Sequence, residues 1–83
     1  MALLTLESGS SSGDIPVNGN TVLNIKVSSG CAFVYLKTLY EIYTIPNTIE
    51  PMHGFVEESI KGWAFIEIRG ENLGITEVDY TLS

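Results

Sequence analysis

The sequence has little of what catalysis or covalent cross-linking requires: one cysteine, one histidine and four basic residues in a chain of 83. A single cysteine excludes a disulfide within the chain, and one cysteine with one histidine cannot supply the usual ligands of a structural zinc site. A domain of this size buries only about 60 to 65% of its unfolded surface, so its core is thin. We therefore expect oligomerisation, or docking on a larger partner, to add stability.

Positive charge is scarce as well. The four basic residues are scattered against ten acidic ones, which gives a formal net charge of −6. This balance repels phosphate polymers and anionic membranes, so we expect no nucleic acid and no membrane partner, but a protein with basic or neutral patches. No apolar run approaches the roughly 18 residues that span a bilayer, and residues 1–4 lack the basic residue of a signal peptide. We expect synthesis in the cytoplasm.

What the sequence does contain is a repeated strand pattern. Four segments are rich in β-branched and aromatic residues and are separated by Gly, Pro, Ser or Asn clusters: residues 2–7, 21–27, 32–43 and 63–69. Apolar residues alternate within them, so that Leu23, Ile25 and Val27 share one face of their segment. This period of two is typical of a half-buried antiparallel strand.

Weaker signals add further strands. Residues 40–45 form a strand pattern that stops at Pro46, residues 55–60 fit a short strand or a helical turn, and residues 73–75 and 77–82 form a terminal strand or pair. Pro51 prevents a long helix, so residues 48–54 are interpreted as a surface loop. Seven or eight short strands at regular spacing predict an all-β fold, a small antiparallel β-sandwich, with a small barrel as the alternative.

The N-terminal region differs from the rest in composition. Residues 8–13 contain only serine and glycine and follow the first strand. We predict an extended arm over residues 1–13, made of a strand and a flexible connection, and a β-sandwich domain over residues 14–83. Such a strand can pair with its own sheet or with a neighbouring molecule.

The residues that carry chemistry do not form a recognisable catalytic pattern. His53 lies in a Pro/Met/Gly loop, and Cys31 begins a strand, where a small buried hydrophobe is the ordinary role. The adjacent pair Glu57 and Glu58 points to opposite faces of a strand, and Glu77 with Asp79 lacks the further oxygen ligands that calcium needs. We predict no catalytic residues, no metal site and no cofactor, and a protein that is not an enzyme.

Aromatic residues are the remaining candidates for function. Phe33 and Tyr35 share the face of their strand opposite to the core, where a neighbouring subunit or solvent covers them. The aromatic residues Tyr35, Tyr40, Tyr43 and Trp63 fit a sugar-binding platform or, equally, core and interface packing. A sugar-binding platform requires flanking Asn, Asp or Gln side chains, whereas these four aromatic residues lie beside apolar ones.

The order of the segments resembles small virion proteins of tailed bacteriophages. In residues 4–20, a Ser/Gly-rich stretch leads into Gly13-Asp14-Ile15-Pro16-Val17-Asn18-Gly19, and a late Trp63 strand ends in Arg69-Gly70. Residues 40–52 depart from that group because they lack an Asp-Gly turn followed by tryptophan. The resemblance implies a compact β-sandwich that decorates or cements a capsid, or a small head or tail fibre component.

On this basis we expect a viral structural protein, a capsid decoration or cement protein located on the capsid surface of the virion. Its partners would be the major capsid protein and further copies of itself, as a trimer or dimer. We expect Leu3, Leu4 and Leu6 to reach a capsid edge or a neighbouring copy, and Phe33, Tyr35 and Trp63 to anchor an interface. The alternative is a receptor- or carbohydrate-binding module of a tail fibre, with Tyr43 and Trp63 in contact with the sugar.

Overall fold

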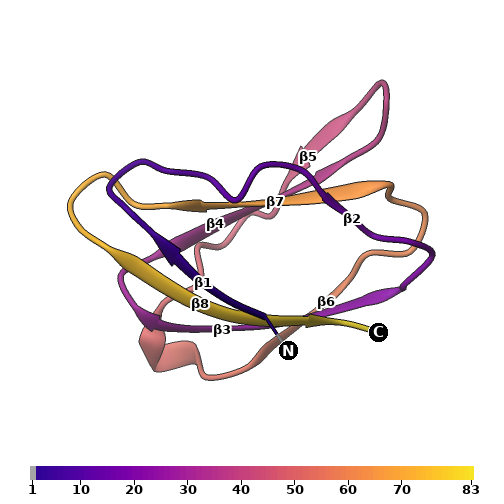
Figure 1. The fold of residues 1–83 in the computed structure, drawn as a ribbon. Coiled ribbons are helices and arrows are strands. Elements are labelled where there is room, and N and C mark those ends of the chain that lie inside the picture. The colour runs from indigo at the N-terminus through magenta and orange to yellow at the C-terminus, as the bar shows by residue number, and fades with distance from the viewer. Residues whose placement is uncertain (1) are drawn as a thin grey trace.

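The computed structural model describes residues 2–83 as two four-stranded antiparallel sheets packed face to face (Figure 1). Sheet A has the strand order β1-β8-β3-β6 and sheet B the order β2-β7-β4-β5. Within the described residues, the elements are β1 (Ala2–Leu6), β2 (Ile15–Pro16), β3 (Val22–Ser29), β4 (Ala32–Lys37), β5 (Ile42–Thr44), the 3-10 turn η1 (Pro51–His53), β6 (Val56–Ser59), β7 (Phe65–Gly70) and β8 (Thr76–Leu82). The predicted all-β sandwich is confirmed. No helix in residues 2–83 is long and apolar enough to cross a membrane.

The core lies between the sheets and is filled by the inward-facing residues, which alternate along each strand with outward-facing ones. Leu23, Ile25 and Val27 on β3 are fully buried, as are Ile66 and Ile68 on β7. The inward positions predicted for β3 from the period of two are therefore confirmed. The other buried hydrophobic residues are Leu6, Val17, Ala32, Val34, Leu36, Ile45, Ile49, Ile60 and Val78.

The turn between β3 and β4 carries the chain from sheet A to sheet B and depends on Gly30. Its φ is +78°, and a Cβ atom there would lie 2.5 Å from the Thr76 Oγ1. Thr76 is fully buried, and its hydroxyl donates to the Cys31 carbonyl and accepts the N–H of Glu71. Any side chain at position 30 would displace the hydroxyl that ties β8 to the start of β4.

Residues 2–13 lie against the sandwich, whereas the sequence predicts an extended arm with a flexible connection. β1 pairs with β8 along its whole length, from Ala2 opposite Tyr80 to Leu6 opposite Thr76. The tract 8–13 then crosses to sheet B, where Ser12 donates its N–H to β7 and Ser10 accepts one from β7 through its carbonyl. Small side chains allow this close approach, so composition alone does not distinguish a packed tract from a flexible one.

Several strand boundaries differ from those predicted. Residues 55–60 contain a strand, β6, as expected, but the strand expected over residues 40–45 is only three residues long. Residues 73–75 belong to no strand, because the chain bends at residues 72–74, so the C-terminal region provides one strand, β8. Ile49 lies in the expected surface loop but is only 2% exposed, and it exchanges two backbone hydrogen bonds with Ala32. It therefore closes the side of the sandwich beside β4.

Candidate functional site: the outer face of sheet B

The outward residues of β4 and β7 form three cross-strand pairs on sheet B: Phe33 with Arg69, Tyr35 with Glu67, and Lys37 with Phe65. The three aromatic residues of this row (Phe33, Tyr35 and Phe65) are called the aromatic face below, and all three are half-buried. Each ring has a long charged side chain as its cross-strand neighbour. The aromatic face therefore combines charged side chains with rings that are partly accessible.

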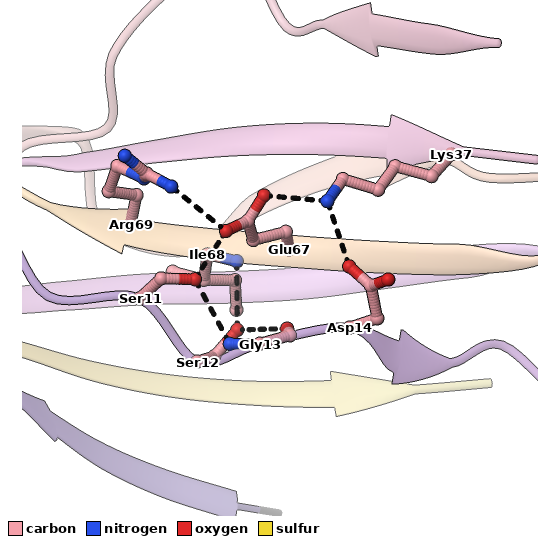
Figure 2. Close-up of polar contacts among 8 residues, drawn as sticks. All are labelled: Ser11, Ser12, Gly13, Asp14, Lys37, Glu67, Ile68 and Arg69. Atoms are coloured by element: carbon pink, nitrogen blue, oxygen red, sulfur yellow. Dashed lines mark hydrogen bonds and ion pairs between the residues drawn. The ribbon is translucent and has the colours of Figure 1, made fainter.

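The charges beside the aromatic face neutralise one another, as Figure 2 shows. Lys37 Nζ lies 2.8 Å from Asp14 Oδ1 and 2.8 Å from Glu67 Oε1, and Arg69 lies 3.3 Å from Glu67 Oε2. The hydroxyl of Ser11 donates to the same carboxylate. Two basic and two acidic side chains thus form one network, which also fastens the tract 8–13 to β7.

The network changes the protonation of its members. The pKa of Glu67 falls from 4.5 to about 2, first because of the hydrogen bond from Lys37 and then because of the one from Ser11. The pKa of Lys37 is raised, chiefly by its hydrogen bond to Asp14 and next by the one to Glu67. Both side chains therefore stay charged at neutral pH, and their charges cancel locally.

The β4–β5 hairpin stands out beside this face. In Figure 1 it rises from the layer of sheet B, away from sheet A. Its turn is closed by the Thr38 N–H, which donates to the Glu41 carbonyl, and by the Thr38 hydroxyl, which accepts the N–H groups of Tyr40 and Glu41. This turn presents Leu39 and Tyr40, called the hairpin tip below, with exposures of 82% and 92%. An ordered turn therefore holds two large apolar side chains in solvent.

The three leucines predicted to contact a partner have different environments in β1. Leu3 is 72% exposed, Leu4 is partly buried against the core, and Leu6 is a core residue at 6% exposure. Alternation along an edge strand explains the difference, since Leu4 and Leu6 face inward while Leu3 faces outward. Of the three, only Leu3 offers its side chain to another molecule in this structure.

The three aromatic residues predicted to anchor an interface all lie on the sheet B side of the sandwich. Phe33 and Tyr35 belong to the aromatic face, whereas Trp63 precedes β7 and packs partly against the core. The ring of Trp63 stacks on that of Tyr43, with 6.1 Å between centroids and 26° between planes. Tyr43 remains 47% exposed, so the pair forms a partly open aromatic edge beside β5.

A groove lies on the side of the sandwich where the chain passes from β5 to β6. It has a volume of about 470 Å³. Two of its lining residues are apolar and four are polar: Asn47, Thr48, Ile49, His53, Val56 and Glu58. Space of this kind accommodates one or two large side chains or a small ligand.

The two residues considered for nucleophilic catalysis have other partners. Burial, followed by the carboxylates of Glu71 and Glu50, raises the pKa of the Cys31 thiol to about 11, so the thiol stays protonated at neutral pH. The Cys31 Sγ donates to a Glu50 carboxylate oxygen at 3.6 Å. His53 Nδ1 accepts the Glu50 N–H at 3.0 Å, which leaves the imidazole oriented by its own turn. Among residues 2–83, no three His, Cys, Asp or Glu side chains are grouped to hold a metal ion.

The outer face of sheet A has a different composition. Its outward positions include Glu57 on β6 and Glu77 and Asp79 on β8, with Lys26 on β3 as the basic residue among them. Lys26 lies over the ring of Phe55, 5.3 Å from its centroid. Among residues 2–83, the Asp79 Oδ1 is the one buried side-chain oxygen or nitrogen without a hydrogen-bond partner. This face is acidic, and it also carries the outward-facing Leu3 of β1.

Sequence reasoning found the aromatic face but missed the hairpin. Leu39, Tyr40 and Ile42 were interpreted as part of strand structure, yet they are among the most exposed large hydrophobic residues. A signal was present, because residues 38–45 contain eight residues with one charge, no glycine and no proline, although they had to include a turn. Turns normally carry Gly, Pro, Asn or Asp, so the apolar composition of this turn was the signal that sequence reasoning could have used.

Comparison with known proteins gives no relative from which a function could be transferred, so the function is inferred from the geometry of the chain. No protein-family model, no curated protein and no solved structure matches it.

Proposed function

We propose that this protein is a structural binding module of a bacteriophage virion, a decoration protein that attaches to the outer surface of the capsid. The observation that carries the proposal is the difference between its two outer faces. Partly exposed aromatic rings and a locally neutral charge network lie on sheet B, whereas acidic residues lie on sheet A. We infer that sheet B faces the shell and sheet A faces solvent.

The aromatic face suits such a role energetically. Interface hot spots are enriched in aromatic residues that are held in position before binding, since little side-chain entropy is then lost. The neutral network beside Phe33 and Tyr35 also lets the chain approach a shell without bringing its net charge of −6 into the contact.

Attachment of this kind would stabilise a capsid by linkage. A molecule that binds the assembled lattice and not the dissociated subunits lowers the free energy of the lattice by its binding free energy. Many copies on one shell multiply that effect.

The direct test is co-sedimentation of the purified protein with empty shells of the phage that encodes it. We expect the double variant Phe33→Ala/Tyr35→Ala to bind at least tenfold more weakly, because hot-spot aromatics contribute about 2 kcal/mol or more each. The matched control is Asn24→Ala/Thr81→Ala, which removes two outward side chains from sheet A and should bind like the wild type.

Circular dichroism melting of each variant separates loss of docking from loss of fold. If the Phe33→Ala/Tyr35→Ala variant binds the shells as strongly as the wild type at a temperature at which both are folded, the aromatic face is removed from the proposal. Wild-type protein that never sediments with the shells would reject the decoration function itself.

A tail-fibre module that binds carbohydrate is the second candidate, and the stacked pair of Tyr43 and Trp63 favours it. Tyr43 is partly exposed, as a sugar-binding ring must be, but the stacking occupies one face of each ring. This function predicts saturable glycan binding that Trp63→Ala or Tyr43→Ala abolishes while the protein stays folded. A glycan array without hits would count against it.

A further inference from the structure

We propose that the free edge of β5 pairs antiparallel with β5 of a second copy, so that two sheets B join into one eight-stranded sheet. The pairing is centred on Tyr43 and is two-fold symmetric. It does not depend on a capsid, and it would hold for this chain whatever larger structure the chain binds.

The backbone of β5 offers the hydrogen-bonding groups that this pairing needs. Residues 42–44 are all exposed, and β5 is the last strand of its sheet. Thr38 donates to the Glu41 carbonyl and Ile45 donates to the Val34 carbonyl, which fixes the alternation along the β4–β5 ladder. It follows that the N–H and C=O groups of Ile42 and Thr44 point away from β4. A second β5 in antiparallel orientation would place Ile42 opposite the partner's Thr44.

The distribution of charge and proline favours pairing at the edge of β5 over the other three sheet edges, which are β1, β2 and β6. The edge strand β6 carries Glu57 and Glu58, and β2 contains Pro16, which has no N–H to donate. β1 has no charge of its own but lies beside Glu77 and Asp79 of β8, so pairing there would bring two acidic faces together. The β4–β5 hairpin carries one charge outside the network, Glu41 in its turn, because Lys37 is held by Asp14 and Glu67.

The remaining like-charge contact across the proposed interface is weak. With Tyr43 opposite Tyr43 of the second copy, the two Glu41 residues are four positions apart along the ladder. This spacing is about 14 Å along the strand direction, which exceeds the Debye length of about 10 Å at 0.1 M salt. Chains that each carry −6 can therefore meet at this edge with little repulsion.

The same register gives the hairpin tip a place to bind. Glu41 would lie opposite Ile45 of the second copy, so the turn that carries Leu39 and Tyr40 lies beside the segment that follows Ile45 in that copy. Pro46 has no N–H, so the ladder ends there, and Asn47 lines the groove of about 470 Å³. Each hairpin tip would thus lie at the mouth of the other copy's groove, as isologous two-fold contacts require.

The apolar area available is sufficient for a weak dimer. Four of the nine exposed large hydrophobic residues of the described chain lie in this hairpin: Leu39, Tyr40, Ile42 and Tyr43. Together they expose roughly 500 Å² per copy, on the scale that aromatic side chains bury in cores. Two copies would bury about 1,000 Å², which is the lower limit for a specific interface.

The test is the mass of the purified full chain, measured by sedimentation equilibrium over roughly 0.01 to 1 mM, the range in which so small an interface is half-populated. We expect a concentration-dependent rise from one chain to two. Ile42→Lys should weaken dimerisation at least tenfold, because it places a lysine on each side of the two-fold axis. The control Leu73→Lys makes the same change at a residue that is 94% exposed in another loop, and it should dimerise like the wild type.

A rescue experiment tests the register itself. Adding Thr44→Glu to Ile42→Lys places each introduced lysine opposite an introduced glutamate of the other copy, so dimerisation should return to within about threefold of the wild type. The single variant Thr44→Pro removes one outward N–H without changing the charge, and it should dimerise more weakly than the wild type. A wild type that stays monomeric at 1 mM, or a double variant that is not rescued while both proteins melt like the wild type, would overturn the proposal.

Discussion

The outer faces of the two sheets differ in charge and in aromatic content. Sheet A presents Glu57, Glu77 and Asp79 with Lys26 as the basic residue, so the field of this face is negative. Sheet B pairs its acidic residues with Lys37 and Arg69 and places aromatic rings between them. The three acidic residues and one basic residue give the outer face of sheet A a net charge of −2, whereas the two acidic and two basic residues of the sheet B network cancel.

The carboxylates of Glu67 on sheet B and Asp79 on sheet A show the same difference between the two sheets in their hydrogen bonding. Glu67 on β7 interacts with Lys37, Arg69 and Ser11, and its pKa is lowered to about 2. Asp79 on β8 has a buried Oδ1 that accepts no hydrogen bond from residues 2–83, although Lys26 is its cross-strand neighbour. A satisfied carboxylate stabilises sheet B, whereas an unsatisfied one costs free energy in sheet A.

The largest expected effect concerns the inner side of sheet A. Leu6→Ala removes a buried side chain from the core and should lower the free energy of unfolding by about 2–5 kcal/mol. Leu3→Ala, in the same strand but 72% exposed, should change it by less than about 0.5 kcal/mol. Chemical denaturation of both variants measures the contrast, and equal effects would mean that β1 is an arm and not part of the sandwich.

A middle-sized effect is expected at the network of sheet B. Glu67→Gln should cost about 1–2 kcal/mol at pH 7, because it removes charge-assisted hydrogen bonds. The pKa of Glu67 is lower in the folded protein than its ordinary value of 4.5, so its contribution to stability is complete above pH 4.5 and is lost as the pH falls toward about 2.

Urea denaturation at a series of pH values should therefore show a steeper loss of stability between pH 4.5 and 2 in the wild type than in Glu67→Gln. The matched control is Asn24→Ala on the outer face of sheet A, which removes no titratable group, so its pH dependence should stay close to that of the wild type. Parallel curves for wild type and Glu67→Gln would show that the network does not couple to folding.

The smallest effect is expected at Asp79 and has the opposite sign. Asp79→Asn replaces a charged acceptor that lacks a partner by a neutral one, so it should leave stability unchanged or raise it by up to about 1 kcal/mol. Thermal melting at pH 7 measures this. A clear loss of stability would indicate that Lys26 pairs with Asp79 in solution, and the contrast between the two carboxylates would then disappear.

Alternation made the strands and the core predictable from sequence. Leu23, Ile25 and Val27 were assigned to one face from the period of two alone, and all three are fully buried. Phe33 and Tyr35 were likewise placed on the outward face of β4. These assignments succeed because side-chain direction along a strand depends on local backbone geometry.

What could not be predicted depends on contacts between distant residues. The close packing of tract 8–13 requires the carbonyl of Ile68 and the N–H of Gly70, which are about 60 positions away along the chain. The hairpin turn uses the Thr38 hydroxyl where glycine or asparagine would have been recognised. Leu6 was assigned to a partner and not to the core, because its depth depends on the pairing of β1 with β8.

The pairing of Ala2 with Tyr80 determines how the molecule would respond to mechanical load. These residues lie at the same end of two antiparallel neighbours, β1 and β8 (Figure 1). Tension applied to the chain just before Ala2 and just after Leu82 would open the β1–β8 ladder one hydrogen bond at a time, like a zipper, instead of shearing all its bonds together. The sandwich should therefore yield at low force when pulled through its ends, whereas force transmitted through β4 and β7 would meet two central strands bonded on both sides.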